Sequence, residues 1–184
     1  ILLFGHTINE MISEKALDMI MTSDPEHILW IEPGTSELFI DLLKLRESLV
    51  EHYEVLYPCS SNAHCPNHWC HQVLRTTHDP SIERLCQLVG LDRKILPMTG
   101  HIYRRKSKQV ALSNSPTVIR YIQETKFSFE YEVCFVEKDE NKNAIIEIQK
   151  KHLTKEEEKF FKNSNVGEKI SFDIEKIVGT KYRV

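Results

Sequence analysis

Apolar residues in the first third of the chain fall alternately into short continuous runs and helical stripes. Residues 1–4, 27–31 and 53–57 are mainly apolar segments of strand length. Between them, residues 13–21 and the stretch from Thr35 or Ser36 to 49 repeat apolar residues at helical spacing. This alternation of strands and helices predicts a parallel α/β sheet. Ligands of such sheets bind beyond the carboxyl ends of the strands.

The last third of the chain has a different pattern, typical of strands. Residues 127–136 alternate apolar and polar side chains for much of their length, residues 141–143 are expected to form a hairpin turn, and residues 144–148 are expected to return as a strand. Thr154 and Glu157 have the spacing of a helical capping box. We therefore expect a small β-rich module over residues 95–184.

The middle of the chain is expected to complete the α/β portion, residues 1–94. Residues 69–77 and 80–89 are read as short helices, the second ending at Gly90. Cys86 lies on the apolar face of the second helix, so we expect a buried, inert thiol there.

The segment 58–71, here called the cysteine loop, holds three cysteines: Cys59, Cys65 and Cys70. Their spacing, C-x5-C-x4-C, is neither that of a zinc-finger pair nor that of a ferredoxin run. Three thiols on one loop can bind a soft metal centre, but a fourth ligand must come from elsewhere. Cys134, in the predicted strand 127–136, is the candidate, and four thiolates suit either a cubane iron–sulfur cluster or a zinc ion.

Two alternatives to this ligand set are open. His64, His68 and His71 lie in the same loop and could replace a cysteine at zinc, although a surface or outer-shell role is more common for a single histidine. The odd, clustered set of five cysteines favours metal binding in a reducing compartment over a disulfide framework.

Charge is distributed unevenly along the chain, although the net value is only −3. Residues 1–58 hold 3 bases and 11 acids (−8), residues 59–130 hold 10 bases and 5 acids (+5), and residues 131–184 hold 11 of each. The densest basic patch consists of Arg104, Arg105, Lys106 and Lys108. These side chains predict contacts with RNA phosphates, and an ordinary exposed loop is the alternative.

Several classes of function find no support in the sequence. No apolar run approaches the roughly 18 residues of a membrane span, and the first residues do not have the pattern of a signal peptide. Because residues 1–4 resemble a buried strand, we expect the chain to be part of a longer protein. The sequence contains no serine elbow, H-E-x-x-H, P-loop or G-x-G-x-x-G motif, so no catalytic residue is assigned.

The order of several motifs resembles one family. These are Ile31-Glu32-Pro33-Gly34-Thr35, Arg46, Pro58-Cys59, His64-Cys65-Pro66, Trp69-Cys70-His71 and Tyr131-Glu132-Val133-Cys134. Together, over about residues 1–150, they are similar to the methyltransferase-like assembly factors of the small ribosomal subunit, a family with mitochondrial and bacterial members.

The resemblance implies the C-terminal half of a class I methyltransferase-like (Rossmann-like) sheet, with a cysteine-rich metal loop and a β-rich module. It implies that Cys59, Cys65, Cys70 and Cys134 hold a 4Fe–4S cluster, with zinc as the alternative. Glu32-Pro33-Gly34-Thr35 would border a pocket for S-adenosylmethionine, which an upstream segment would mainly bind.

The resemblance further implies a ribosome assembly factor that binds small-subunit rRNA and ribosomal proteins, in the mitochondrial matrix or the bacterial cytoplasm. The alternatives are an active S-adenosylmethionine-dependent rRNA methyltransferase, a zinc-stabilised RNA-binding module and a redox-sensing module. Whether the protein is an enzyme is left open by this segment.

Overall fold

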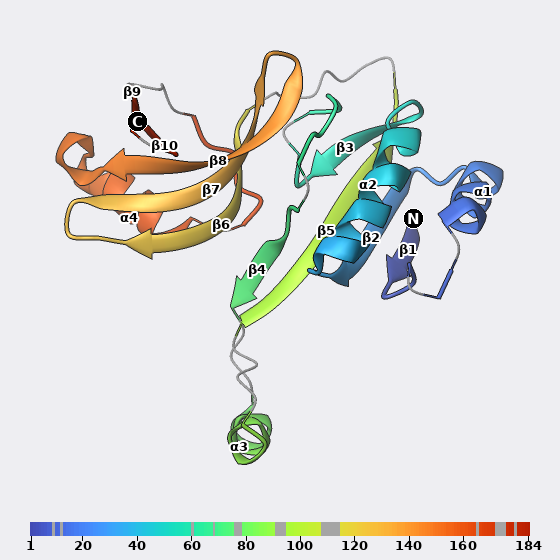
Figure 1. Cartoon of the computed structure of the whole chain (residues 1–184), viewed down its shortest axis with the longest axis horizontal. Coiled ribbons are helices and arrows are strands. Elements are labelled where there is room, and N and C mark those ends of the chain that lie inside the picture. Colours follow the sequence, from blue (N-terminus) through green and yellow to red (C-terminus); the bar gives the residue numbers. More distant parts are fainter. Residues whose placement is uncertain are drawn as a thin grey trace.

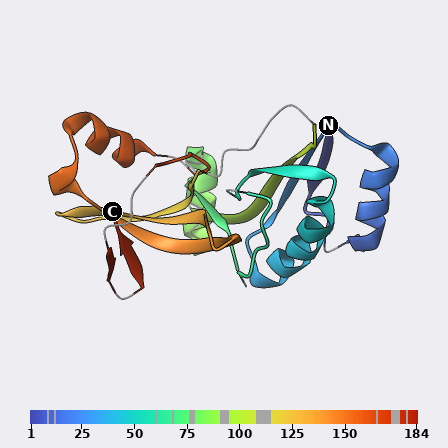
Figure 2. The same cartoon turned by 90° about the horizontal axis from the view of Figure 1, so that it is seen from above.

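The structure is a computed structural model, and it describes residues 1–8, 10–11, 13–59, 61–67, 69–75, 79–90, 95–107, 115–164, 166–171, 176–178 and 180–184. These residues form a mixed α/β fold with two mixed sheets, which lie on opposite sides of the molecule (Figures 1 and 2). The elements up to the second sheet are β1 (Leu2–Gly5), α1 (Ser13–Ser23), β2 (His27–Pro33), α2 (Ser36–Leu49), β3 (Tyr53–Tyr57), β4 (Gln72–Arg75), α3 (Pro80–Leu88) and β5 (Ile95–Arg105). The remaining elements are β6 (Thr117–Glu124), β7 (Ser128–Glu137), β8 (Glu140–Gln149), the 3-10 turn η1 (Lys150–His152), α4 (Lys155–Asn163), β9 (Lys176–Val178) and β10 (Lys181–Arg183).

The first sheet has the strand order β1-β2-β5-β3. Strands β1 and β2 are parallel, as the alternation of strands and helices predicts. Strand β5 lies between β2 and β3 and is antiparallel to both, so β2 and β3 point in the same direction. Strand β4 pairs with the first half of β5, on the same side as β3.

Helix α2 positions the cysteine loop because it packs one apolar stripe on the sheet. Its first turn begins at Thr35, whose side chain accepts a hydrogen bond from the Leu38 amide. The buried side chains of the helix are Phe39, Leu42, Leu45, Arg46 and Leu49. Arg46 is thus a cation on the buried face of an otherwise apolar stripe, and this feature is important for the site.

The second sheet has the order β6-β7-β8-β10-β9, with antiparallel β6–β7 and β7–β8 pairs. The hairpin between β7 and β8 turns at Lys138 and Asp139, both of which have positive φ (52° and 62°). The predicted turn at residues 141–143 is therefore wrong. Positive φ at two successive residues is the geometry of a two-residue hairpin turn, and asparagine-glycine is only its commonest sequence. Asn141 lies in β8 instead.

Two further predictions differ from the structure. Residues 72–75 form strand β4 rather than part of a helix, because they pair with β5. Strand β5 belongs to the first sheet, whereas the sequence had placed residues from 95 onward in the second module. A strand that inserts between two earlier strands leaves no local signal of the sheet it will join.

Helix α3 projects away from both sheets at the tip of the β4–β5 arm (Figure 1). None of its residues is buried, and its apolar side chains Ile82, Leu85 and Leu88 are exposed. Cys86 is only partly buried, which contradicts the prediction of a core thiol. Among the described residues, no helix has the length and apolar character needed to cross a membrane.

Candidate metal centre

The four predicted ligand cysteines line one small cavity at the junction of the two sheets. Cys59, Cys65 and Cys70 come from the cysteine loop between β3 and β4, and Cys134 comes from the middle of β7. Their exposed fractions are 7%, 6%, 8% and 3%, respectively. The cavity has a volume of about 10 Å³, roughly the space that one water molecule needs. The structure thus brings together residues from two sheets, as the ligand prediction requires.

Two side chains, one from the side of each sheet, hold the cysteine loop by donating hydrogen bonds to the same two carbonyl groups of the loop. Arg46 Nη2, from α2, donates hydrogen bonds to the carbonyl oxygens of Ser61 (3.0 Å) and Ala63 (2.8 Å). Asn141 Nδ2, from β8, donates to the same two oxygens at 3.2 and 2.6 Å. The backbone N–H of Asn141 also donates to the backbone carbonyl of His64 at 2.7 Å. These contacts fix the loop between the two sheets through protein groups alone.

Each of the four sulfur atoms has a polar neighbour. Asn67 Nδ2 donates to Cys65 Sγ at 3.2 Å, and the Cys134 thiol lies 3.8 Å from Asn141 Oδ1. Arg46 and Asn143 line the same cavity as Cys59 and Cys70, and against the larger effect of burial Arg46 lowers the pKa of Cys59 and Asn143 lowers that of Cys70. Nitrogen donors beside thiol sulfurs are the groups that stabilise bound thiolates.

Burial changes the ionisation of the thiols in the metal-free chain. It raises the pKa of Cys59 to about 12, although the nearby Arg46 cation acts in the opposite direction. Burial also raises the pKa of Cys70 well above its usual value. Metal ligands are thiolates, so a bound metal would displace protons from these groups, and binding would weaken as the pH falls.

The donor set fits a group held by four thiolates: four buried cysteines line one cavity, beside a buried cation and an amide side chain. Within the described ranges, no group of three or more His, Cys, Asp or Glu side chains has the arrangement of ligands around a single metal ion. That finding does not choose between a cluster and zinc, so both stay predictions.

The histidines of the cysteine loop do not line the cavity in the described part of the chain. The exposed His64 side chain places its Nδ1 3.5 Å from Glu47 Oε2. The His71 ring stacks on Trp69, with ring centroids 4.3 Å apart. His68 lies outside the described residues.

A histidine that sequence reasoning missed, His101 in β5, does line the cavity. Its Nδ1 lies 2.8 Å from the Tyr103 hydroxyl. Burial, with a smaller effect of Arg46, lowers the His101 pKa to about 3, so its imidazole is neutral.

The residues predicted to border a methyl-donor pocket, Glu32 to Thr35, form a tightly packed turn. The buried Glu32 Oε1 accepts hydrogen bonds from the Thr7 amide (2.8 Å), the Ile8 amide (3.1 Å) and Trp30 Nε1 (2.9 Å). A Cβ atom on Gly34 would lie 2.8 Å from backbone atoms of Pro97 and Met98 in β5. Pro33 ends β2, and Thr35 caps α2. Each residue of this motif therefore has a structural role in the first sheet.

The predicted RNA-contact residues lie at the end of β5, and two of them are paired with carboxylates. Arg104 Nη2 lies 2.7 Å from Glu54 Oε2, and Arg105 forms an ion pair with Asp24. Lys106 Nζ donates to the Glu51 carbonyl at 3.1 Å. Lys108 lies outside the described residues. This basic segment, Arg104 to Lys106, is therefore partly neutralised by Glu54 of β3 and by Asp24, which follows α1.

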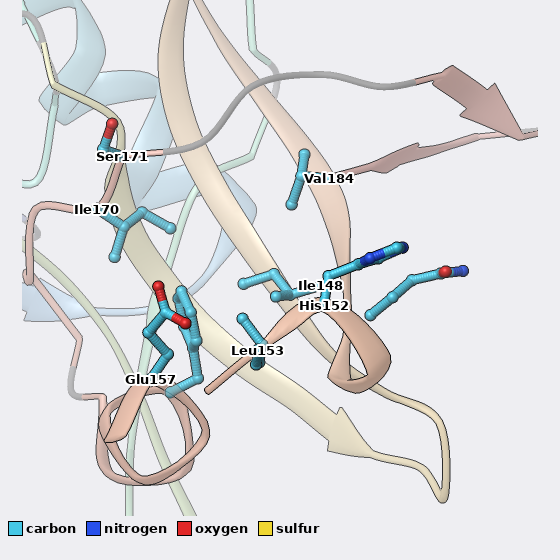
Figure 3. Close-up of a pocket in the computed structure, with 9 residues that line it drawn as sticks. Ile148, His152, Leu153, Glu157, Ile170, Ser171 and Val184 are labelled. Carbon is cyan, nitrogen blue, oxygen red and sulfur yellow. The ribbon is translucent and has the colours of Figure 1, made fainter. Parts of the chain in front are cut away.

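A larger cavity, of about 180 Å³, lies in the second module between β8, α4 and the chain end (Figure 3). Most of its lining is apolar: Ile148, Leu153, Phe161, Ile170 and Val184. Its one carboxylate, Glu157, accepts hydrogen bonds from Thr154 in the capping box of α4, as the sequence predicts. Gln149, His152 and Ser171 complete the lining.

No protein-family model matches the chain, and no curated protein matches it.

Proposed function

We propose that the chain is a metal-containing, methyltransferase-like assembly factor of the small ribosomal subunit that binds rRNA. The carrying observation is the convergence of Cys59, Cys65, Cys70 and Cys134 on one cavity between the two sheets. A 4Fe–4S cluster is the proposed occupant, because the resemblance implies it, and a zinc ion held by the same thiolates is the alternative.

The metal's proposed role is structural. Three of its ligands would come from a loop next to the first sheet and one from β7 of the second sheet, so binding free energy would hold the sheets together. The Arg46 and Asn141 hydrogen bonds act at the same junction. The metal would therefore complete a junction that protein contacts already define.

The order of the first sheet supports the class I methyltransferase-like assignment. Those sheets have an antiparallel strand inserted between the last two parallel strands, and β5 occupies such a position between β2 and β3. The Glu32 to Thr35 turn lies at the carboxyl end of β2, where ligands of open α/β sheets bind. We assign no catalytic residue.

The proposal of rRNA binding depends on the motif resemblance and on the positive charge of residues 59–130. This segment contains 10 basic and 5 acidic residues. Ribosomal proteins are the expected neighbours in an assembling subunit. The compartment would be the mitochondrial matrix or the bacterial cytoplasm, according to the source.

The test is purification without oxygen, followed by iron, sulfide and zinc analysis and a visible absorption spectrum. We expect about four iron and four sulfide per chain with a broad thiolate-to-iron band near 400 nm, typical of cubane clusters. Stoichiometric zinc without colour would replace the cluster by the zinc alternative. Absence of both metals would overturn the proposed centre, and failure of the metal-loaded chain to bind small-subunit rRNA would overturn the assembly role.

A further inference from the structure

We propose that Arg46, Asn67 and Asn143 are positioning residues that donate hydrogen bonds to metal-bound sulfurs, with Arg46 also balancing the charge of the thiolates. This inference rests on the proposed four-thiolate centre and goes beyond it, because it assigns a function to residues that are not ligands.

Arg46 is placed where a buried cation needs an anion. Its side chain is fully buried, and a buried charge is costly unless it is paired and hydrogen-bonded. Two of its hydrogen bonds go to neutral carbonyl groups, those of Ser61 and Ala63. Its carboxylate partner, Glu47, lies 2.6 Å from Nη1 and is one-third exposed to solvent. Arg46 also lines the cavity of the four cysteines.

The cavity next to Arg46 indicates which anion the site is built for. Arg46 and Cys59 both line this cavity, so the buried guanidinium lies beside the candidate ligands. The buried Arg46 Nε has no hydrogen-bond partner among the described residues, so a donor remains for a bound group. A thiolate bound to a metal would supply the negative charge that a neutral thiol does not.

Two amide side chains lie beside other cysteines of the site. Asn67 Nδ2 donates to Cys65 Sγ at 3.2 Å, from within the cysteine loop. Asn143, in β8, lines the same cavity as Cys70, and its Nδ2 donates to Glu132 Oε1 at 3.4 Å. Side chains with N–H donors from α2, the loop and β8 therefore lie around the four cysteines. Hydrogen bonds to sulfur withdraw electron density and set the affinity and electronic properties of thiolate centres.

The experiment uses Co²⁺ as a probe, because its thiolate charge-transfer band reports the electron density on sulfur. The full chain is stripped of metal without oxygen and titrated with Co²⁺ against a competing chelator. Arg46→Gln should weaken Co²⁺ binding by about 10–100-fold, the usual effect of losing such a contact, and move the band to longer wavelength. Arg46→Lys, which keeps the charge, should recover part of the affinity.

Arg104→Gln is the matched control, since Arg104 is also an ion-paired arginine, although only partly buried, and it lies on β5 without lining the cavity of the cysteines. It should leave affinity and band unchanged. Asn67→Leu removes a neutral donor from a partly exposed position and should also move the band to longer wavelength, even if Arg46→Gln fails to fold.

The outcomes separate this inference from the proposed centre. If the wild-type chain takes up neither Co²⁺ nor an iron–sulfur cluster, the proposed centre is wrong. If the wild-type chain binds Co²⁺ while Arg46→Gln, or in its place Asn67→Leu, keeps the wild-type affinity and band position, the inference is wrong. A band shift in both variants, absent in Arg104→Gln, supports it.

Discussion

The cysteine junction and the basic segment Arg104 to Lys106 were both predicted as sites, and the structure treats them differently. At the junction, four thiols from two sheets surround one cavity, with a buried cation and amides directed at them. At the end of β5, by contrast, Arg104 and Arg105 already have carboxylate partners in Glu54 and Asp24.

The difference shows which kinds of sequence signal indicate a site. A cluster of thiols has few roles in a protein interior other than binding a metal, so its convergence is informative. A cluster of basic residues has many partners available on its own surface, and ion pairs with nearby acids are common and weak. The junction is therefore the stronger of the two candidate sites.

Replacing the cysteine that comes from the second sheet should have the largest effect. Cys134→Ser removes one of four proposed ligands, so metal content measured after purification should fall close to background, and the two sheets should lose part of their mutual stability. Cys86→Ser, in the projecting helix α3, is the control and should keep its metal. Full metal retention in Cys134→Ser would remove the distinction between the junction and an ordinary core.

Removing the clamp from β8 should have the next largest effect. Asn141→Ala deletes hydrogen bonds to two carbonyl groups of the cysteine loop at a fully buried position, and we expect a loss of about 2–3 kcal/mol in the free energy of unfolding. Chemical denaturation of the metal-free chain measures it. Asn163→Ala, at an exposed position in α4, should cost well under half as much. Equal losses would show that the clamp does not stabilise the junction.

The basic segment can be tested residue by residue. The Arg105 and Lys106 side chains are more exposed than Arg104, so the double variant Arg105→Ala/Lys106→Ala should weaken rRNA binding several-fold and reduce the salt slope by about 1–2. Arg104→Ala should change affinity little, since Glu54 holds its side chain. Filter binding over a salt series distinguishes them. An unchanged slope in the double variant would exclude this segment as an rRNA contact.

Replacing a paired carboxylate away from both sites should have the smallest effect on stability, and the change in the free energy of unfolding shows how much one ion pair contributes. Glu130 in β7 is buried and accepts a hydrogen bond from Lys181 Nζ at 2.6 Å. This contact, with a smaller effect of the hydrogen bond from Gln123, lowers the Glu130 pKa below its usual value. The unfolded chain binds that proton more tightly, so the pair stabilises the fold above about pH 4.5 and loses this contribution as the pH falls through the lowered pKa.

Glu130→Gln should therefore cost about 1 kcal/mol at pH 7 and nothing near pH 2. Denaturation curves at the two pH values measure the difference. A cost that does not depend on pH would mean that side-chain packing, not charge, dominates at this position.

The sequence predicted much of the first sheet because its signals are local. Apolar runs and helical stripes define β1, α1, β2, α2 and β3, and the capping pattern at Thr154 defines the start of α4. The pairing of strands that are distant in the sequence could not be predicted from these local signals. Strand β5 inserts between two earlier strands, and β4 exists because it pairs with β5.

The candidate site divides in the same way. The convergence of Cys134 with the three loop cysteines could be predicted, since three thiols need a fourth ligand. The polar residues that line the cavity beside the cysteines could not be predicted as a set. Arg46, His101 and Asn143 come from three elements, and their approach to the cavity depends on tertiary packing. A buried arginine in an apolar helical stripe is the one signal that could have been read, because a cation there needs a partner.

The distance along the chain between the third and fourth cysteines also has a consequence for biosynthesis. Cys134 lies 64 positions after Cys70 (134 − 70), so a growing polypeptide exposes three thiols well before the fourth is translated. Insertion of the proposed metal would then have to follow translation of Cys134, so the three loop thiols would wait without their fourth ligand.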